Sequence, residues 1–72
     1  MKITKVNDSS VVSGYFYNED TKVLLVEYHN KSVYLYQDIS SSIVKKVFTA
    51  DSIGKALRKY VLEKDPTPLR IK

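Results

Sequence analysis

The sequence predicts an α+β fold, in which a three-stranded antiparallel β-meander is followed by two helices packed on one face of the sheet. Two observations lead to this prediction. The first half of the chain holds three runs of β-branched and aromatic residues with short polar connectors, and only antiparallel neighbours can be joined by connectors this short. In the second half, apolar residues recur at the three- and four-residue spacing of amphipathic helices.

The three predicted strands cover residues 10–17, 22–28 and 32–38. The connectors between them, NEDT and HNKS, are rich in residues that favour turns. Residues 1–8 form a lead-in, and the segment NDSS marks the turn into the first strand. The three runs are therefore expected to form one sheet in chain order.

The first helix is predicted over residues 40–48, where serine can cap the N-terminus and the apolar residues fall on one side. The second helix is predicted over residues 52–65, with Asp51 or Ser52 as its N-cap. Its apolar residues follow the spacing of a stripe that faces a core. Pro66 is expected to end it.

One small domain, residues 9–65, is expected to hold the whole core, and residues 66–72 are expected to form an extended tail. A chain of 72 residues that is 43% hydrophobic and 28% charged suits a single globular domain. No apolar run approaches the roughly 18 residues that span a bilayer, and the N-terminus has no signal-peptide core. We therefore expect a cytoplasmic protein without membrane contact.

The residue types give no basis for catalysis. The chain has one histidine and no cysteine, which excludes a thiolate nucleophile, a disulfide framework and a thiolate metal site. His29 lies in a polar turn, and the carboxylates are too scattered to form a metal site. No glycine-rich phosphate loop is present. The expectation is a protein that is not an enzyme and has no cofactor, metal or small-molecule substrate.

The orientation of the third strand stays open from the residues alone. Tyr34 and Tyr36 share one face of that strand, and Val33 and Leu35 share the other. A connection of three or five residues would turn the tyrosines toward the helices, whereas two or four would turn them away.

An ordered series of short motifs runs through the chain. Its members are Ser9-Ser10 with Val12, Tyr17-Asn18, LLVEY at 24–28, VYLY at 33–36, Ile39, the pattern Ala50-x-Ser52-x-Gly54, Leu57 and Val61. With this series the chain resembles the KTSC domain, which is named for its place at the carboxy terminus of some lysyl-tRNA synthetases. The domain also occurs as a stand-alone bacterial or phage protein. The resemblance runs from Ser9 to Pro66.

The resemblance implies that the tyrosines of VYLY face the helices. Together with the apolar spacing of the strands and helices, this orientation assigns to the core Leu24, Val26, Tyr28, Tyr34, Tyr36, Val47, Leu57 and Val61. The chain also departs from the family pattern. Phe16 stands where the family has a glycine, Lys31-Ser32 replaces a glycine-rich turn, and Ser40 replaces a proline.

With the tyrosines inside, apolar residues remain on the sheet face away from the helices. These candidate interface residues are Phe16, Val23, Leu25, Val33 and Leu35. Large exposed apolar patches usually mark an interface, so the first hypothesis is a module that binds another protein or itself, such as a bacterial or phage regulator. Two alternatives stay open: the tail covers this face through Leu69 and Ile71, or the register is reversed.

The second hypothesis is nucleic-acid binding, with RNA as the expected nucleic acid. The formal charge is +4, and the positive excess follows the strands. The candidate phosphate-binding residues are Lys45, Lys46, Lys55, Arg58 and Lys59. Fusion to a synthetase suggests RNA as the partner. Binding through phosphates would weaken steeply with salt, whereas an apolar interface would persist.

Overall fold

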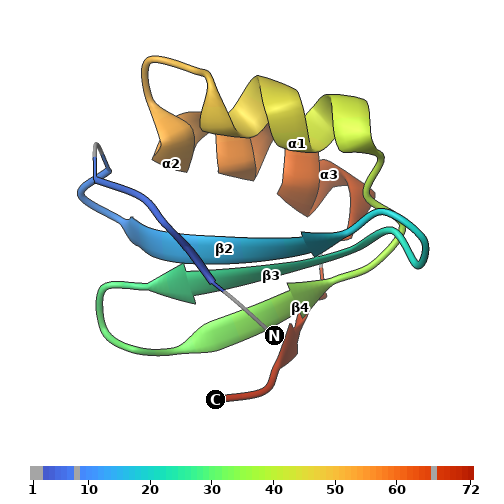
Figure 1. Cartoon of the computed structure of the whole chain (residues 1–72), viewed down its shortest axis with the longest axis horizontal. Coiled ribbons are helices and arrows are strands. Elements are labelled where there is room, and N and C mark those ends of the chain that lie inside the picture. The colour runs from blue at the N-terminus through green and yellow to red at the C-terminus, as the bar shows by residue number, and fades with distance from the viewer. Residues whose placement is uncertain (1–2, 8, 66) are drawn as a thin grey trace.

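A five-stranded antiparallel sheet has two helical segments on one of its faces (Figure 1). The structure, a computed structural model, describes residues 3–7, 9–65 and 67–72. The strands pair in chain order: β1 (Thr4–Lys5), β2 (Val12–Asn18), β3 (Val23–Tyr28), β4 (Val33–Tyr36) and β5 (Leu69–Arg70). The predicted α+β meander with helices on one face is therefore confirmed.

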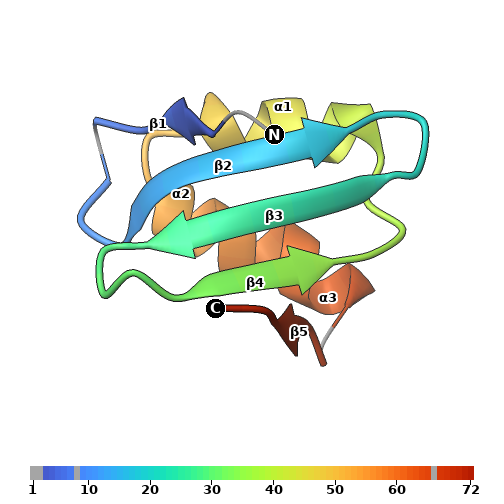
Figure 2. The ribbon, with the colours of Figure 1, turned by 60° about the horizontal axis from the view of Figure 1, so that its bottom comes forward.

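The sheet is wider than the three predicted strands. β1 lies in the expected lead-in and pairs with β2, and β5 lies in the expected tail and pairs with β4 (Figure 2). Strands of two residues are too short to show an alternating pattern, so the sequence could not predict them. Pro66, the expected end of the second helix, lies outside the described residues, as do Met1, Lys2 and Asp8.

The connection between β3 and β4 decides which way β4 faces. Glu27 and Val33 form the cross-strand pair nearest the turn, and the connection between them consists of five residues, 28–32. The connection closes with a hydrogen bond from the Tyr28 N–H to the Ser32 carbonyl (2.9 Å), and Lys31 adopts a left-handed backbone with φ 73°. A connection with an odd number of residues turns Tyr34 and Tyr36 toward the helices.

The register across the sheet agrees with this orientation. Tyr36 lies opposite Leu24, and Tyr34 lies opposite Val26. Leu24 and Val26 are fully buried beneath the helices. The same rows include Tyr17 and Tyr15 of β2, so aromatic side chains of β2 and β4 flank Leu24 and Val26 on the helix-facing side.

The helices begin where serine caps them. In α1 (Ser41–Phe48), the Ser40 hydroxyl accepts a hydrogen bond from the Ile43 N–H. The second helical segment runs without a break through α2 (Ile53–Ala56), η1 (Leu57–Val61) and α3 (Leu62–Lys64). The Ser52 hydroxyl accepts from the Lys55 N–H, so the cap is Ser52 rather than Asp51.

The middle of the second segment is a π-helical turn, which the sequence did not predict. The Leu62 N–H donates to the Leu57 carbonyl, five residues back. Such a turn adds one residue to an otherwise α-helical stretch and is frequent at functional sites.

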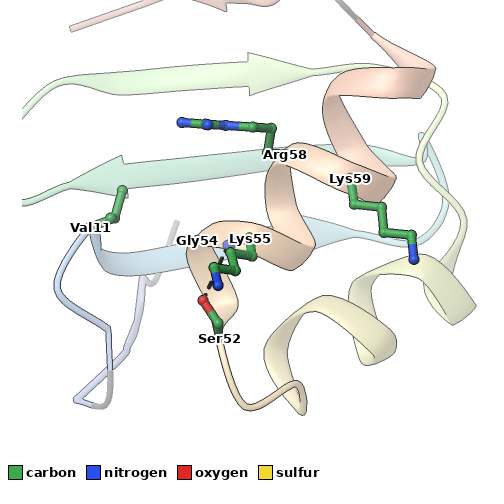
Figure 3. A pocket seen from close by; sticks show the side chains of 6 residues that line it. All are labelled: Val11, Ser52, Gly54, Lys55, Arg58 and Lys59. Carbon is green, nitrogen blue, oxygen red and sulfur yellow. Dashed lines mark hydrogen bonds between the residues drawn. The ribbon is translucent and has the colours of Figure 1, made fainter.

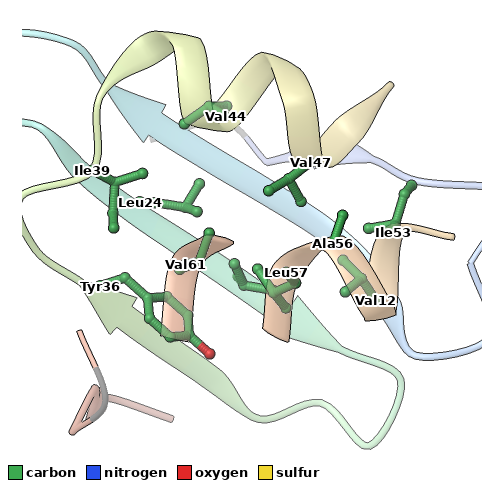
Figure 4. Packing of buried hydrophobic residues seen from close by; sticks show 11 residues of the cluster. Val12, Leu24, Tyr36, Ile39, Val44, Val47, Ile53, Ala56, Leu57 and Val61 are labelled. Atoms are coloured by element: carbon green, nitrogen blue, oxygen red, sulfur yellow. The ribbon is translucent and has the colours of Figure 1, made fainter. Parts of the chain in front are cut away.

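The core lies between the sheet and the two helical segments (Figure 4). Six of the residues assigned to it from the sequence are buried there: Leu24, Val26, Tyr36, Val47, Leu57 and Val61. Tyr28 and Tyr34 are only partly buried and pack at its margin. Tyr15 of β2 stacks on Phe48 of α1 at 3.8 Å between ring centroids, which seals the side of the core near β1.

Gly14 allows β1 to pack closely against β2. A Cβ atom at this position would lie 2.6 Å from Ile3 Cγ2 and 3.0 Å from the Thr4 carbonyl oxygen. The Thr4 oxygen belongs to the backbone, so relief of this clash would require β1 to move.

We predict that Gly14→Ala lowers the free energy of unfolding by about 1–3 kcal/mol, the range for overpacking. Urea denaturation followed by circular dichroism measures this. Gly54→Ala is the matched control, because a Cβ there would meet only the side chain of Val11, whose Cγ2 atom is closest at 3.3 Å. Equal stability of the wild type and Gly14→Ala would contradict the prediction.

Candidate binding surfaces

The sheet face away from the helices, called the outer face below, is apolar across most of its width. Its apolar residues are Phe16, Val23, Leu25, Val33, Leu35, Leu69 and Ile71. Direct cross-strand pairs place Phe16 beside Leu25, Leu25 beside Leu35, and Leu35 beside Leu69. We call these four residues the apolar row. They cross β2, β3, β4 and β5 in a single line.

The tail extends the outer face and does not cover it. β5 pairs with the edge of β4 in the plane of the sheet, so the alternative of a covering tail is wrong (Figure 2). Leu69 and Ile71 remain 59% and 47% exposed. No helix or strand formed by residues 3–7, 9–65 and 67–72 lies over this face.

Two candidate interface residues are less accessible than the sequence suggested. Leu25 and Val33 are only 6% and 7% exposed, although both point to the outer face. Phe16 and Leu35 lie on either side of Leu25 on the neighbouring strands. The accessible part of the outer face is therefore formed by the partly buried Phe16, Val23 and Leu35 with the exposed tail residues.

The candidate basic residues are all exposed, but they do not form one strip. Lys45 and Lys46 are consecutive in α1, so their side chains project about 100° apart. Lys46 and Lys59 approach one ring: their Nζ atoms lie 5.8 and 5.4 Å from the centroid of the Tyr60 ring. These three residues, called the Tyr60 cluster below, join α1 to the second segment.

Lys55 and Arg58 line a different feature, called the basic hollow below. It is a hollow of about 400 Å³, bordered also by Val11, Ser52, Gly54 and Lys59 (Figure 3). The side chains of Arg58 and Lys59 point away from each other, with Lys59 directed toward α1 (Figure 3).

A second depression, called the tyrosine groove below, has a volume of about 550 Å³. Its aromatic lining consists of Tyr28, Tyr34 and Tyr36, and Leu62 of α3 also lines it. Val11 lines both the tyrosine groove and the basic hollow, so the two depressions adjoin. This groove could not be predicted from the sequence, because its lining residues come from segments far apart in the chain.

Two hydroxyl groups meet at the inner wall of the groove. The oxygens of Tyr28 and Tyr36 are 2.6 Å apart, and the rings of Tyr28 and Tyr34 meet edge to face at 5.7 Å. Burial is the main cause that raises the pKa of Tyr36, and the hydrogen bond with Tyr28 raises it further. Burial also raises the pKa of Tyr28, while its bond to Tyr36 acts in the opposite direction.

Ser9 and His29 have structural contacts next to the groove, which His29 lines. The Ser9 hydroxyl accepts hydrogen bonds from the backbone N–H groups of Val11 and Val12. His29 Nε2 donates to the Ser9 carbonyl at 2.9 Å. The described residues contain no group of three or more histidine, cysteine, aspartate or glutamate side chains that could hold a metal. Within the same residues, no helix has the length and apolar character to cross a membrane.

Comparison with protein families gives one match: the KTSC domain matches residues 8–64. The chain belongs to the KTSC domain family. Comparison with curated proteins gave no match. The KTSC segment includes all residues of the Tyr60 cluster and the basic hollow, whereas β5, with Leu69 of the apolar row, lies beyond it.

The buried tyrosine pair predicts a dependence of stability on alkaline pH. Because the folded state holds these protons more tightly than the unfolded chain, their stabilising effect is complete below about pH 10, the unfolded tyrosine pKa. It is lost as the pH rises through the higher pKa values of the folded state. Above pH 10 we expect the free energy of unfolding to fall by up to about 1.4 kcal/mol per pH unit for each such tyrosine.

Urea denaturation between pH 8 and 11 measures this slope. Tyr36→Phe should reduce it, whereas Tyr60→Phe, which leaves the pair intact, should not. Identical slopes for the wild type and Tyr36→Phe would contradict the prediction.

Proposed function

We propose that the protein is a non-enzymatic binding module that acts in the cytoplasm and associates with a second copy of itself through the outer face. The observation that supports this proposal is the apolar row, which crosses four neighbouring strands with no described element above it. A small regulatory protein of bacterial or phage origin fits this description.

A second copy suits this face for geometric reasons. Two sheets pack face to face at about 10 Å with interdigitating side chains. A two-fold axis through the face would bring the apolar row of one copy against that of the other, as a closed dimer requires.

The charge distribution favours the same partner. Each chain has a formal charge of +4, which opposes association. The candidate basic residues lie on the helices, on the opposite side of the sheet from the outer face. In a face-to-face dimer these charges would lie at the two far ends, where screening by salt weakens their repulsion.

We predict that Leu35→Lys and Leu69→Lys each weaken self-association at least tenfold, because a charge would have to be desolvated in an apolar interface. Light scattering over a range of concentrations should give twice the 8.3 kDa chain mass for the wild type, in low and high salt alike.

Val11→Lys is the matched control. Val11 is 46% exposed, close to the 47% of Ile71, but it lies at the basic hollow rather than on the outer face. This variant should associate as the wild type does. A wild-type mass of one chain at every concentration would contradict self-association.

A second candidate function is nucleic-acid binding through the helical side. The observation that favours it is the Tyr60 cluster, in which two ammonium groups from separate helices converge on one ring. Phosphate groups of RNA could bind between these lysines, with a strong dependence on salt.

For this candidate we predict that Lys46→Gln and Lys59→Gln weaken binding of single-stranded RNA and reduce the slope of log K against log salt by about 0.7 each. Fluorescence anisotropy with labelled RNA at several salt concentrations measures both effects. Lys64→Gln removes the same charge outside the cluster and should leave the slope unchanged. Equal slopes for all three variants would contradict a role of the cluster.

A further inference from the structure

The tyrosine groove has the features of a site for a flat, polar ring. Its volume of about 550 Å³ falls within the range of about 300–1,000 Å³ that is typical of small-ligand sites. Aromatic side chains form one wall, and Tyr34 is only partly buried, so its ring is accessible from the groove. Stacking on tyrosine is a sequence-tolerant way to bind a nucleobase.

Two polar side chains at the groove are held in fixed orientations. His29 Nε2 donates to a carbonyl oxygen, so this nitrogen bears the hydrogen and Nδ1 of the neutral ring is an acceptor. Asn30 Oδ1 accepts hydrogen bonds from the Ser32 N–H (3.0 Å) and the Ser32 hydroxyl (2.5 Å). The amide nitrogen of Asn30 is thereby assigned and directed away from Ser32. His29 and Asn30, which line the groove, thus carry an acceptor and a donor of the kinds that the edge of a base requires.

The adjoining basic hollow has positively charged side chains that can bind a phosphate. Arg58 and Lys55 line it, and Val11 is the residue that it shares with the groove. Arg58 precedes Leu62, the groove residue of α3, on the same helical segment. A guanidinium group binds phosphate through paired N–H donors.

We propose that the tyrosine groove and the basic hollow together bind a nucleotide unit, with the base against Tyr34 and the phosphate at Arg58. The unit can come from a free nucleotide or from a single-stranded nucleic acid, because both contain the same base and phosphate. This proposal does not depend on the outer face. It extends the second candidate function by a base-binding element that the Tyr60 cluster lacks.

Titration of the ¹⁵N-labelled chain followed by NMR tests the proposal. The probes are AMP, UMP, ribose 5-phosphate, and short single-stranded oligoadenylate and oligouridylate. We expect chemical-shift changes in the backbone amides of residues 28–36 and 55–62 with nucleotides. Ribose 5-phosphate should affect only the residues of the basic hollow, and more weakly. Binding of mononucleotides would identify a free nucleotide as a sufficient ligand, and binding of oligomers alone would identify a single strand.

Two matched pairs of variants separate the roles. Tyr34→Leu keeps an apolar side chain but removes the ring, and should weaken nucleotide binding roughly tenfold or more. Tyr34→Phe keeps the ring and should bind as the wild type does. Arg58→Gln should weaken binding of both nucleotides and ribose 5-phosphate, whereas Lys64→Gln, which removes a charge from the same segment outside the hollow, should not. The amide spectrum of each variant shows whether it is folded.

Three results would overturn the proposal. These are the absence of shifts in residues 28–36 with every probe at millimolar concentration, unchanged nucleotide affinity in folded Tyr34→Leu, and ribose 5-phosphate binding as tightly as AMP. A result that contradicts only the role of the Tyr60 cluster is distinguishable from a result that contradicts this proposal. In the first case, Lys46→Gln would leave RNA affinity unchanged, whereas Tyr34→Leu would still reduce it.

Discussion

The orientation of β4, and with it the choice of side chains that enter the core, depends on the five-residue connection between β3 and β4. Because side chains alternate along a strand, a change of one residue in this connection would exchange the two faces of β4. Tyr36 would then leave the core, and Leu35 would enter it. The connection is held by a backbone hydrogen bond from Tyr28 to Ser32 and by the left-handed conformation of Lys31. One short turn therefore determines both the tyrosine groove and the apolar row.

The two faces of the sheet have different roles in a small domain. The helix-facing side forms the core, and its outermost tyrosines also line a depression. Tyr28 and Tyr34 are therefore neither wholly core nor wholly surface. The outer face contributes nothing to that core, although its central residue Leu25 is only 6% exposed.

Local chemistry made much of the fold predictable from the sequence. Residues able to cap a helix mark both helix starts in the sequence, and the structure shows that Ser40 and Ser52 are the caps. Apolar spacing identifies the buried residues Val47, Leu57 and Val61. Strand orientation was ambiguous from the residues themselves and followed only from the family resemblance. The short strands β1 and β5 depend on pairing with distant segments and have no local signal. For the same reason the convergence of Lys46 and Lys59 on Tyr60, and the groove itself, could not be predicted from one linear sequence.

The Tyr28–Tyr36 contact has a further consequence for hydrogen-bond polarity inside the groove. Two hydroxyl groups bring two hydrogens, and only one of them can lie between the oxygens. The other stays on the accepting hydroxyl, and no described residue forms a second hydrogen bond with either oxygen. The pair therefore offers one unmatched donor, and it can change which ring offers it by a concerted rotation of both O–H bonds. A ligand that accepts a hydrogen bond from this donor would fix one of the two possible directions of the hydrogen bond between Tyr28 and Tyr36.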